Sequence, residues 1–268
     1  MSSTEYQFTS ITGGETAIAA LATCCPLSKL KLKDAMQKGA VWLKRGRSSK
    51  RLRRATTLLQ AGDVLALHYD ADLLEREAPE PRLVADEGQY SIWDKPAGLL
   101  AQGTLEGDHC SLLRLAERQL GRETLLVHRL DREASGLMLV AHSPRAAALL
   151  SALFAREGGP LTKLYRVEVR GALPAGGTLE APLDGKSALT RYTRLSHDAT
   201  LDRSLADVEL VTGRKHQIRR HFAGIGCPVL GDPRYGSGNR DPRGLQLRAV
   251  RLRFECPISR RHRDYQLP

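Results

Sequence analysis

The stretch from His128 to Ala141, HRLDREASGLMLVA, constrains the fold of this chain more than any other. Residues 125–130 and 137–141 are apolar and typical of strands, whereas residues 131–136 are polar or small, as in a turn. The pattern predicts a β-hairpin with Asp131 where a buried strand emerges into a loop. A sheet holds such a carboxylate rigidly and leaves it open to a ligand, as catalysis requires. The alternative is a turn aspartate that only accepts hydrogen bonds from backbone amides.

The remaining periodicity predicts strands that arrive in hairpins, with helices placed irregularly between them. Alternating apolar and charged residues predict a strand at 163–171, and a second strand is expected at 206–211. Ser143 followed by Pro144 predicts the start of a helix that runs to about Arg156. This order of elements predicts an α+β fold with a mixed, mostly antiparallel central sheet, rather than a doubly wound one.

A charged segment interrupted by two prolines divides the chain. Residues 75–82, EREAPEPR, are typical of a linker, so we expect one domain at 1–75 and a second at 76–268. Between Ser28 and Gln60 the first domain has eleven basic residues and one acidic residue, within a chain of net charge +11. Segregated positive charge attracts nucleic acid, because neutralised phosphates release counterions. A solvated basic surface without a specific partner is the alternative.

The first domain resembles an S4-type RNA-binding module. Two short helices are expected at 17–22 and 30–38, followed by short strands around a basic loop. Residues 38–41 (KGAV) and 61–64 (AGDV) carry the resemblance. It implies a small α/β module whose cations straddle an RNA backbone.

Three segments of the second domain stand out together: residues 128–137 (HRLDREASGL), 163–165 (KLY) and 213–221 (GRKHQIRRH). The turn at 95–99 (KPAGL) precedes them and residues 231–236 (GDPRYG) follow. Together these segments resemble the pseudouridine synthases of the family that modifies uridines in ribosomal and transfer RNA. The resemblance extends in order over about residues 90–254. Departures from the family pattern, none of which removes a group that the chemistry needs, occur at Ala134, Lys215 and Gln102-Gly103.

The resemblance implies that Asp131 is the catalytic carboxylate, Tyr165 the active-site aromatic residue and Arg219 its basic partner. An arginine there would keep the carboxylate charged in a dry site, where burial alone favours the neutral acid. The tyrosine ring could stack on a uracil. The structural alternatives are that Tyr165 is a half-buried core residue and that Arg219 is a surface cation. The candidates for contact with substrate are Arg129, Ile218, His128, Lys95, Arg214 and Gln217.

Pseudouridine formation breaks the N1–C1′ bond of a uridine and joins C5 to C1′. An ionised Asp131 could attack the sugar, attack the base or remove a sugar proton, and the sequence does not choose among these routes. The target uridine must be flipped out of its stack at a cost of a few kcal/mol. Arg129 is a candidate to fill the vacated stack or to hold the flipped nucleotide.

Two other functions fit parts of the pattern. A non-catalytic RNA-binding or ribosome-assembly factor would use the second domain as a scaffold, although the presence of all three site residues favours an enzyme. A hydrolase would use Ser135, His128 and Asp131. The sequence lacks the G-x-S-x-G motif of such enzymes, and these residues lie too close together on one hairpin for triad geometry.

Uracil isomerisation needs no oxidant and no Lewis acid, so we expect neither a cofactor nor a metal. His128, His216 and His221 are expected to be neutral and bonded to the backbone. The sequence has no G-x-x-x-x-G-K-[ST] loop for a nucleotide cofactor. Five cysteines without a C-x-x-C pair, no secretory signal and no long apolar run predict a soluble, cytoplasmic protein with no membrane contact. The expected partner is structured RNA, ribosomal or transfer, and the expected state is a monomer.

Overall fold

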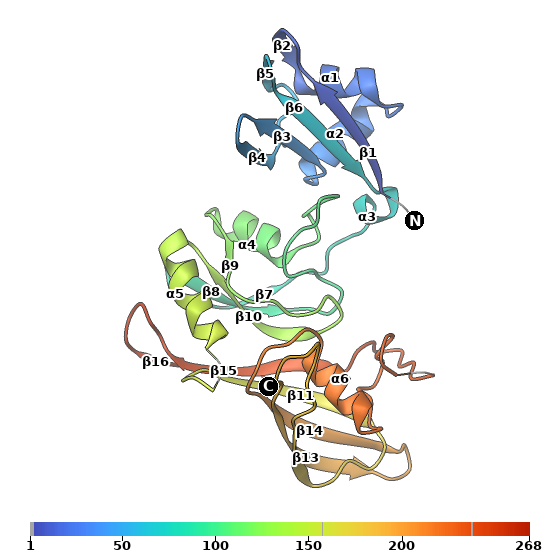
Figure 1. Ribbon diagram of the computed structural model, residues 1–268, viewed down its shortest axis with the longest axis vertical. Helices are drawn as coiled ribbons and strands as arrows, with labels where there is room; N and C mark the ends of the chain where they lie inside the picture. The colour runs from blue at the N-terminus through green and yellow to red at the C-terminus, as the bar shows by residue number, and fades with distance from the viewer. Residues whose placement is uncertain (1–2, 157, 237) are drawn as a thin grey trace. The chain divides into compact units, whose positions relative to one another are not determined.

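The computed structural model describes residues 3–156, 158–236 and 238–268, and the chain divides into two compact units (Figure 1). Unit 1 comprises the residues up to Ala78 together with Gln102–Leu115, and unit 2 comprises Pro79–Ala101 and Ala116–Pro268. The segment Gln102–Leu115, which the sequence places in the second domain, thus belongs with the first unit. Nothing in its composition indicated this.

Unit 1 contains a four-stranded antiparallel sheet in the order β1-β6-β3-β4 and a separate pair, β2-β5. Its strands are β1 (Thr4–Thr9), β2 (Gly13–Thr16), β3 (Val41–Arg45), β4 (Ser48–Arg51), β5 (Leu58–Gln60) and β6 (Val64–Tyr69), and its helices are α1 (Ala17–Cys24), α2 (Lys29–Gln37) and α3 (Ala71–Leu74). The side chains of Thr16 and Ser28 accept a backbone N–H at the start of α1 and α2, which fixes where these helices begin.

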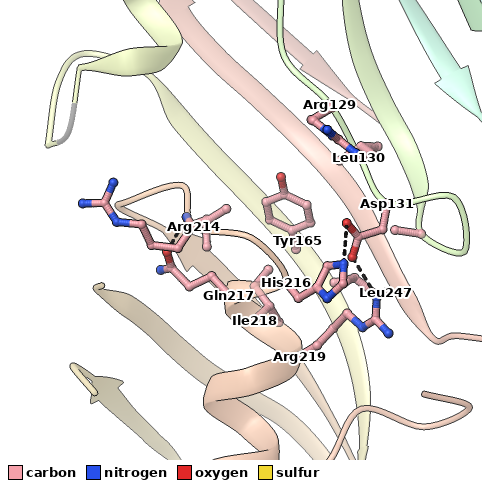
Figure 2. A pocket seen from close by; sticks show the side chains of 12 residues that line it. Arg129, Leu130, Asp131, Tyr165, Arg214, His216, Gln217, Ile218, Arg219 and Leu247 are labelled. Carbon is pink, nitrogen blue, oxygen red and sulfur yellow. Dashed lines mark hydrogen bonds and ion pairs between the residues drawn. The ribbon is translucent and has the colours of Figure 1, made fainter. Parts of the chain in front are cut away.

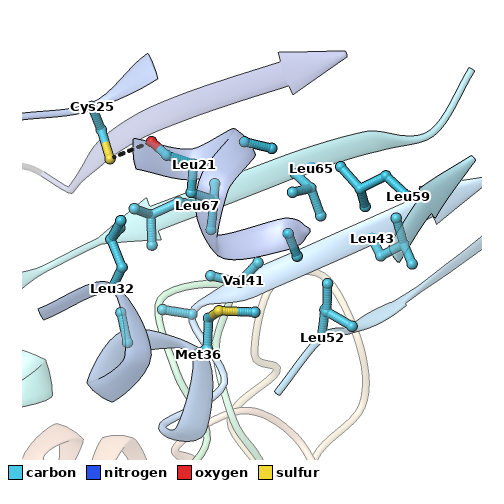
Figure 3. Close-up of a cluster of buried hydrophobic side chains, with 14 of the residues drawn as sticks. Leu21, Cys25, Leu32, Met36, Val41, Leu43, Leu52, Leu59, Leu65 and Leu67 are labelled. Carbon is cyan, nitrogen blue, oxygen red and sulfur yellow. Dashed lines mark hydrogen bonds between the residues drawn. The ribbon is translucent and has the colours of Figure 1, made fainter. Parts of the chain in front are cut away.

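The core of unit 1 lies between these helices and the sheet (Figure 3). Leu32, Ala35 and Met36 share one face of α2 because they are three and four residues apart. They pack in one buried cluster with Leu65 and Leu67 of β6.

Unit 2 contains a ten-stranded sheet in the order β12-β13-β14-β11-β15-β10-β8-β7, with β16 added to β15 and β9 to β10. Its strands are β7 (Arg82–Asp86), β8 (Tyr90–Lys95), β9 (Leu125–Leu126), β10 (Ser135–Ala141), β11 (Thr162–Arg170), β12 (Gly176–Leu179), β13 (Thr190–Asp198), β14 (Arg203–Leu210), β15 (Leu247–Glu255) and β16 (His262–Gln266). Helix α4 (Leu112–Leu120) begins among the residues of unit 1, and α5 (Pro144–Ala155) and α6 (Gln217–Gly224) belong to unit 2. The pairing of β10 with β15 is parallel and the others are antiparallel, which confirms the α+β prediction with its mixed sheet.

The predicted hairpin is only partly present. β9 has two residues, which pair with Ala141 and Val140, and the following residues 127–134 form a loop instead of a longer strand. The cause is His128, whose Nε2 accepts the backbone N–H of Leu139 at 2.9 Å in place of a strand carbonyl. The prediction of a strand over 125–130 was therefore wrong beyond its second residue. Asp131 lies in the loop before β10, not at the tip of a tight hairpin.

Two local features position β10 in the fold. Ser143 accepts a hydrogen bond from the N–H of Ala146, so that α5 begins as predicted and packs its apolar face on the buried β10. Gly136 has φ +108°, and a Cβ at this position would overlap the carbonyl oxygen of Ala249 on the neighbouring β15. Only glycine permits this approach, which places the loop that carries Asp131 beside β15.

Candidate active site

One pocket of unit 2 lies where the 127–134 loop, β11, β15 and the start of α6 meet (Figure 2). It encloses about 420 Å³, including the space at its open side. The pocket is lined by Arg129, Leu130, Asp131, Ala134, Tyr165, Leu210, Arg214, His216, Gln217, Ile218, Arg219 and Leu247.

Arg219 connects two carboxylates through three of its donors. Its Nη1 donates to Oδ2 of Asp131 at 2.9 Å, while Nε and Nη2 donate to the two oxygens of Asp232 at 2.7 and 2.8 Å. Asp232 also accepts the backbone N–H groups of Arg234 and Tyr235. The planar guanidinium matches a carboxylate with two parallel hydrogen bonds, so Asp232 fixes the orientation of Arg219 towards Asp131.

The two carboxylates differ in how deeply they are buried. The side chain of Arg219 is 3% exposed and residue Asp232 is 1% exposed, whereas the Asp131 side chain is 23% exposed. Burial disfavours the charged guanidinium, but hydrogen bonds and charge from both carboxylates outweigh it and raise the pKa of Arg219. Burial also disfavours the Asp232 carboxylate, but its bonds to Arg219 and to two backbone N–H groups hold its pKa below the usual value. With Asp131 ionised, the three groups carry a net charge of −1.

Tyr165 reaches the pocket from a distorted part of β11. The register between β11 and β15 shifts between Leu164 and Tyr165, and such irregularities change the direction of a side chain. Ala249 of β15 pairs with Tyr165 on one side and with Gly136 on the other, which brings Tyr165 near the loop of Asp131. Burial and then the negative charge of Asp131 raise the pKa of Tyr165, so its hydroxyl stays protonated at neutral pH.

The structure brings together most of the residues that the sequence selected. Asp131, Tyr165 and Arg219 share the pocket, as the sequence analysis expected of a catalytic group. The predicted substrate contacts at Arg129 and Ile218 also line it, with Arg129 exposed and Ile218 buried.

Arg214 and Gln217 line the pocket as well, but the amide of Gln217 is engaged within the protein. Its Nε2 donates to Leu189 and Thr190, and its Oε1 accepts from the hydroxyl of Thr212 and the N–H of Arg214. These four hydrogen bonds use the full capacity of a side-chain amide. Gln217 therefore ties α6 to the sheet, and its amide has no group left for a substrate.

Two other predicted substrate contacts lie away from the pocket. Lys95 is fully buried, and its ammonium donates to the carbonyls of Pro96, Leu99, Arg132 and Ala134, which ties the KPAGL turn to the loop of Asp131. Burial lowers its pKa to about 8, against the opposing charges of Glu133 and Asp131.

His128 is the second of these residues. Its ring stacks on Phe154 with 3.9 Å between centroids, and burial lowers its pKa to about 3. The neutral ring can therefore accept the N–H of Leu139. It supports the loop rather than a substrate.

Three residues that surround Asp131 and Arg219 were not predicted to have a role at the site. They are Asp232, Tyr235 and His216, whose Nε2 lies 3.6 Å from Oδ1 of Asp131. The ring of Tyr235 lies 5.2 Å from the Arg219 guanidinium carbon. His216 belongs to the segment GRKHQIRRH, and Asp232 and Tyr235 belong to GDPRYG. Both segments stood out in the sequence, so the Asp and Tyr of the second segment could have been selected as site residues.

In the residues that the structure describes, no group of three or more His, Cys, Asp or Glu is arranged to hold a metal. Over the same ranges, no helix has the length and apolar character needed to span a membrane.

Comparison with known proteins decides the family. Residues 89–224 match the family described as RNA pseudouridylate synthase. The chain belongs to this family. The resemblance seen in the sequence is thereby confirmed, and the matched residues contain Asp131, Tyr165 and Arg219 but end before Asp232.

Relatives in the pseudouridylate synthase family extend the match beyond these residues. "Ribosomal large subunit pseudouridine synthase D" of Pseudomonas aeruginosa is 32% identical over 253 residues, covering 83% of this chain and 76% of the relative. The protein of the same name from Xanthomonas campestris is 31% identical over 214 residues, covering 71% of this chain and 63% of its own length. The solved structure of human RNA pseudouridylate synthase domain containing 4 has a TM-score of 0.57 at 25% identity, covering 69% of this chain and 87% of that one.

Proposed function

We propose that this chain is an RNA pseudouridine synthase in which Asp131 is the reacting carboxylate. One observation carries the proposal: Arg219 binds one oxygen of Asp131 at 2.9 Å while the buried Asp232 holds the rest of the guanidinium. The carboxylate is thereby held in place, yet it remains partly exposed beside Tyr165. A group that attacks or deprotonates a nucleotide needs this combination.

The isomerisation is balanced without any other reactant. The N1–C1′ bond breaks, the C5–C1′ bond forms, and one proton leaves C5 while one is gained at N1. Asp131 would act on the sugar, on the base or on a sugar proton, and the guanidinium of Arg219 would stabilise its charge in each case. No electron transfer is required.

The other pocket residues suit the binding of a uracil. The ring of Tyr165 offers a stacking surface, and Ile218 and Leu247 supply apolar walls that exclude water. The protonated hydroxyl of Tyr165 would serve as a hydrogen-bond donor. Arg129 is exposed next to the pocket, where it could hold a flipped nucleotide or replace it in the RNA stack.

We also propose that unit 1 is an S4-like RNA-binding module. Part of its basic tract is engaged within the unit, because Arg45 pairs with Asp63, and Arg51 and Arg53 pair with Asp108. The exposed hairpin of β3 and β4 presents further cations for phosphates, namely Lys44, Arg47 and Lys50.

Between the two RNA classes left open by the sequence, we propose ribosomal RNA of the large subunit as the substrate. The support is that the relatives from Pseudomonas aeruginosa and Xanthomonas campestris are named for the large ribosomal subunit. Specificity for one uridine would come from the shape of the RNA around it.

Release of tritium from C5-labelled uridine tests the proposal. A transcript of large-subunit ribosomal RNA and a pool of transfer RNA are incubated with the wild type, with Asp131→Asn and with a control, Asp207→Asn, which removes a carboxylate that does not line the pocket. We expect release from the ribosomal transcript by the wild type and the control, and none by Asp131→Asn, which should bind the RNA with nearly wild-type affinity. Turnover by Asp131→Asn would refute its role. Binding without release from either RNA by the wild type would favour the scaffold function instead.

A further inference from the structure

His216 has a strained backbone that its helix does not require. It precedes α6 with φ 54° and ψ 29°, in the left-handed region, and its side chain makes no capping hydrogen bond. The other non-glycine residues described with positive φ are Asp184, Asp202 and Arg260, which are exposed turn residues. A left-handed residue costs of order 1 kcal/mol and is retained where the surroundings determine it. At His216 these surroundings are the pocket.

The imidazole of His216 faces the carboxylate of Asp131 through one ring nitrogen (Figure 2) and the hydroxyl of Tyr235 through the other. Its Nε2 is 3.6 Å from Oδ1 of Asp131, the oxygen that Arg219 does not bind, and its Nδ1 is 2.9 Å from the hydroxyl of Tyr235. The two rings meet edge to face, with 5.6 Å between centroids. Each oxygen of Asp131 therefore has its own partner on α6 or immediately before it.

Burial and nearby positive charges favour the neutral form of this imidazole. Burial is the largest influence that lowers the pKa of His216; the negative charge of Asp131 opposes it, and the positive charges of Arg219, Arg234 and Lys215 lower it further. A neutral imidazole has one N–H and one lone pair. The anionic Oδ1 favours the N–H on Nε2, and the Tyr235 hydroxyl fixes this tautomer by donating to Nδ1.

We propose that His216 is a positioning residue for Asp131, with its Nε2–H directed at Oδ1 in a tautomer that the hydroxyl of Tyr235 fixes. The inference rests on the proposed function, in which Asp131 is the reacting group. At 3.6 Å the contact is longer than a hydrogen bond, so the N–H dipole orients the carboxylate without occupying Oδ1. Arg219 holds the other oxygen, and the carboxylate plane is set from both sides.

The tautomer can be measured without any RNA. In protein labelled with ¹⁵N-histidine, the ring nitrogens of His216, assigned by their loss in His216→Asn, should show a protonated Nε2 and an unprotonated Nδ1 at neutral pH. Tyr235→Phe removes only the hydroxyl and keeps the ring beside Arg219. It should shift both nitrogen signals towards a mixture of tautomers. A protonated Nδ1 in the wild type would overturn the proposal.

Kinetics test the positioning role. Tyr235→Phe should lower kcat about tenfold, the effect of losing one neutral hydrogen bond, with KM changed less than about twofold. His216→Asn tolerates the left-handed backbone but cannot reach Asp131, and it should give a similar loss. The double variant should be no slower than His216→Asn, because both changes break one chain of contacts. Losses that multiply, or a wild-type kcat in His216→Asn, would overturn the proposal.

The control is Tyr192→Phe, which removes the hydroxyl of a tyrosine that packs on Phe222 behind α6, with 5.5 Å between ring centroids. It should leave kcat unchanged, and urea unfolding should show that all variants are folded at the assay temperature. If the wild type itself releases no tritium from RNA, the proposed function fails, whereas the tautomer measurement still decides the arrangement of His216.

Discussion

Replacing Asp232 with asparagine should destabilise unit 2 far more than the same change at Asp131, although both carboxylates bind Arg219. Asp232 is 1% exposed and accepts two bonds from Arg219 and two from backbone N–H groups. In Asp232→Asn the carbonyl oxygen keeps some of these bonds, but an NH2 group faces the Nε–H of Arg219. The guanidinium then stays buried with only one charged partner.

The size of the effect follows from burial. Breaking a buried ion pair by removing one charge costs about 3–5 kcal/mol, and we expect about 3 kcal/mol here because one acceptor remains. The Asp131 side chain is 23% exposed, accepts one bond from Arg219, and is replaced by an amide oxygen that can still accept it. Solvent screens this partly exposed pair, so Asp131→Asn should cost about 1 kcal/mol or less.

Urea unfolding measures this difference. The chain has two tryptophans, of which Trp42 lies in β3 of unit 1 and Trp93 is fully buried in β8 of unit 2. In a Trp42→Phe background, fluorescence reports the unfolding of unit 2 alone. Asp131→Asn should be inactive but nearly as stable as this background, and Asp232→Asn should unfold at a clearly lower urea concentration. Equal losses of stability for the two variants would refute the division between an anchoring and a reacting carboxylate.

Three further predictions concern the surroundings of the site. Unit 2 should lose stability as the pH falls from 6.5 towards 3. Burial lowers the pKa of His128 to about 3, so in this pH range only the unfolded chain binds a proton at His128. If the urea midpoint of His128→Gln falls as steeply with pH as that of the wild type, this reasoning is wrong. Changing Lys44, Arg47 and Lys50 together to glutamine should weaken RNA binding and lower its salt slope by about 3, and an unchanged slope would place the RNA surface elsewhere. Lys95→Met should lower the free energy of unfolding by about 2–4 kcal/mol and should also lower kcat, because it leaves buried carbonyls without a hydrogen-bond donor. Wild-type urea midpoints and turnover would show that the link between the KPAGL turn and the loop of Asp131 is dispensable.

The sequence indicated residues that share one pocket better than it indicated what surrounds them. Asp131, Tyr165 and Arg219 come from segments far apart in the chain, and the pattern of motifs was enough to select them. The hydrophobic pattern also indicated β10 and β11, because a buried central strand is continuously apolar and a half-buried one alternates. The loop before β10 was not predicted, since it depends on a side chain, His128, replacing a strand partner.

Contacts between distant residues account for what the sequence could not provide. Helix α6 begins at Gln217, inside the segment GRKHQIRRH, because His216 takes a left-handed conformation that no local pattern encodes for a histidine. The sequence shows how many basic residues lie between Ser28 and Gln60, but it does not show which of them form ion pairs within the protein. Arg51 and Arg53 bind Asp108, which lies in a segment that the sequence placed with the other domain.

The shape of Arg219 explains how one cation can be anchored by Asp232 and still orient Asp131, the proposed reacting carboxylate. Two of its donors are held by Asp232, so the guanidinium cannot turn to bind both oxygens of Asp131 and cover them. Only one oxygen of Asp131 is taken, and the other remains available to a substrate. A lysine at this position would carry the same charge on a flexible stem without the planar fork. It could pair with the buried carboxylate or with the reacting one, but it could not fix the distance between them.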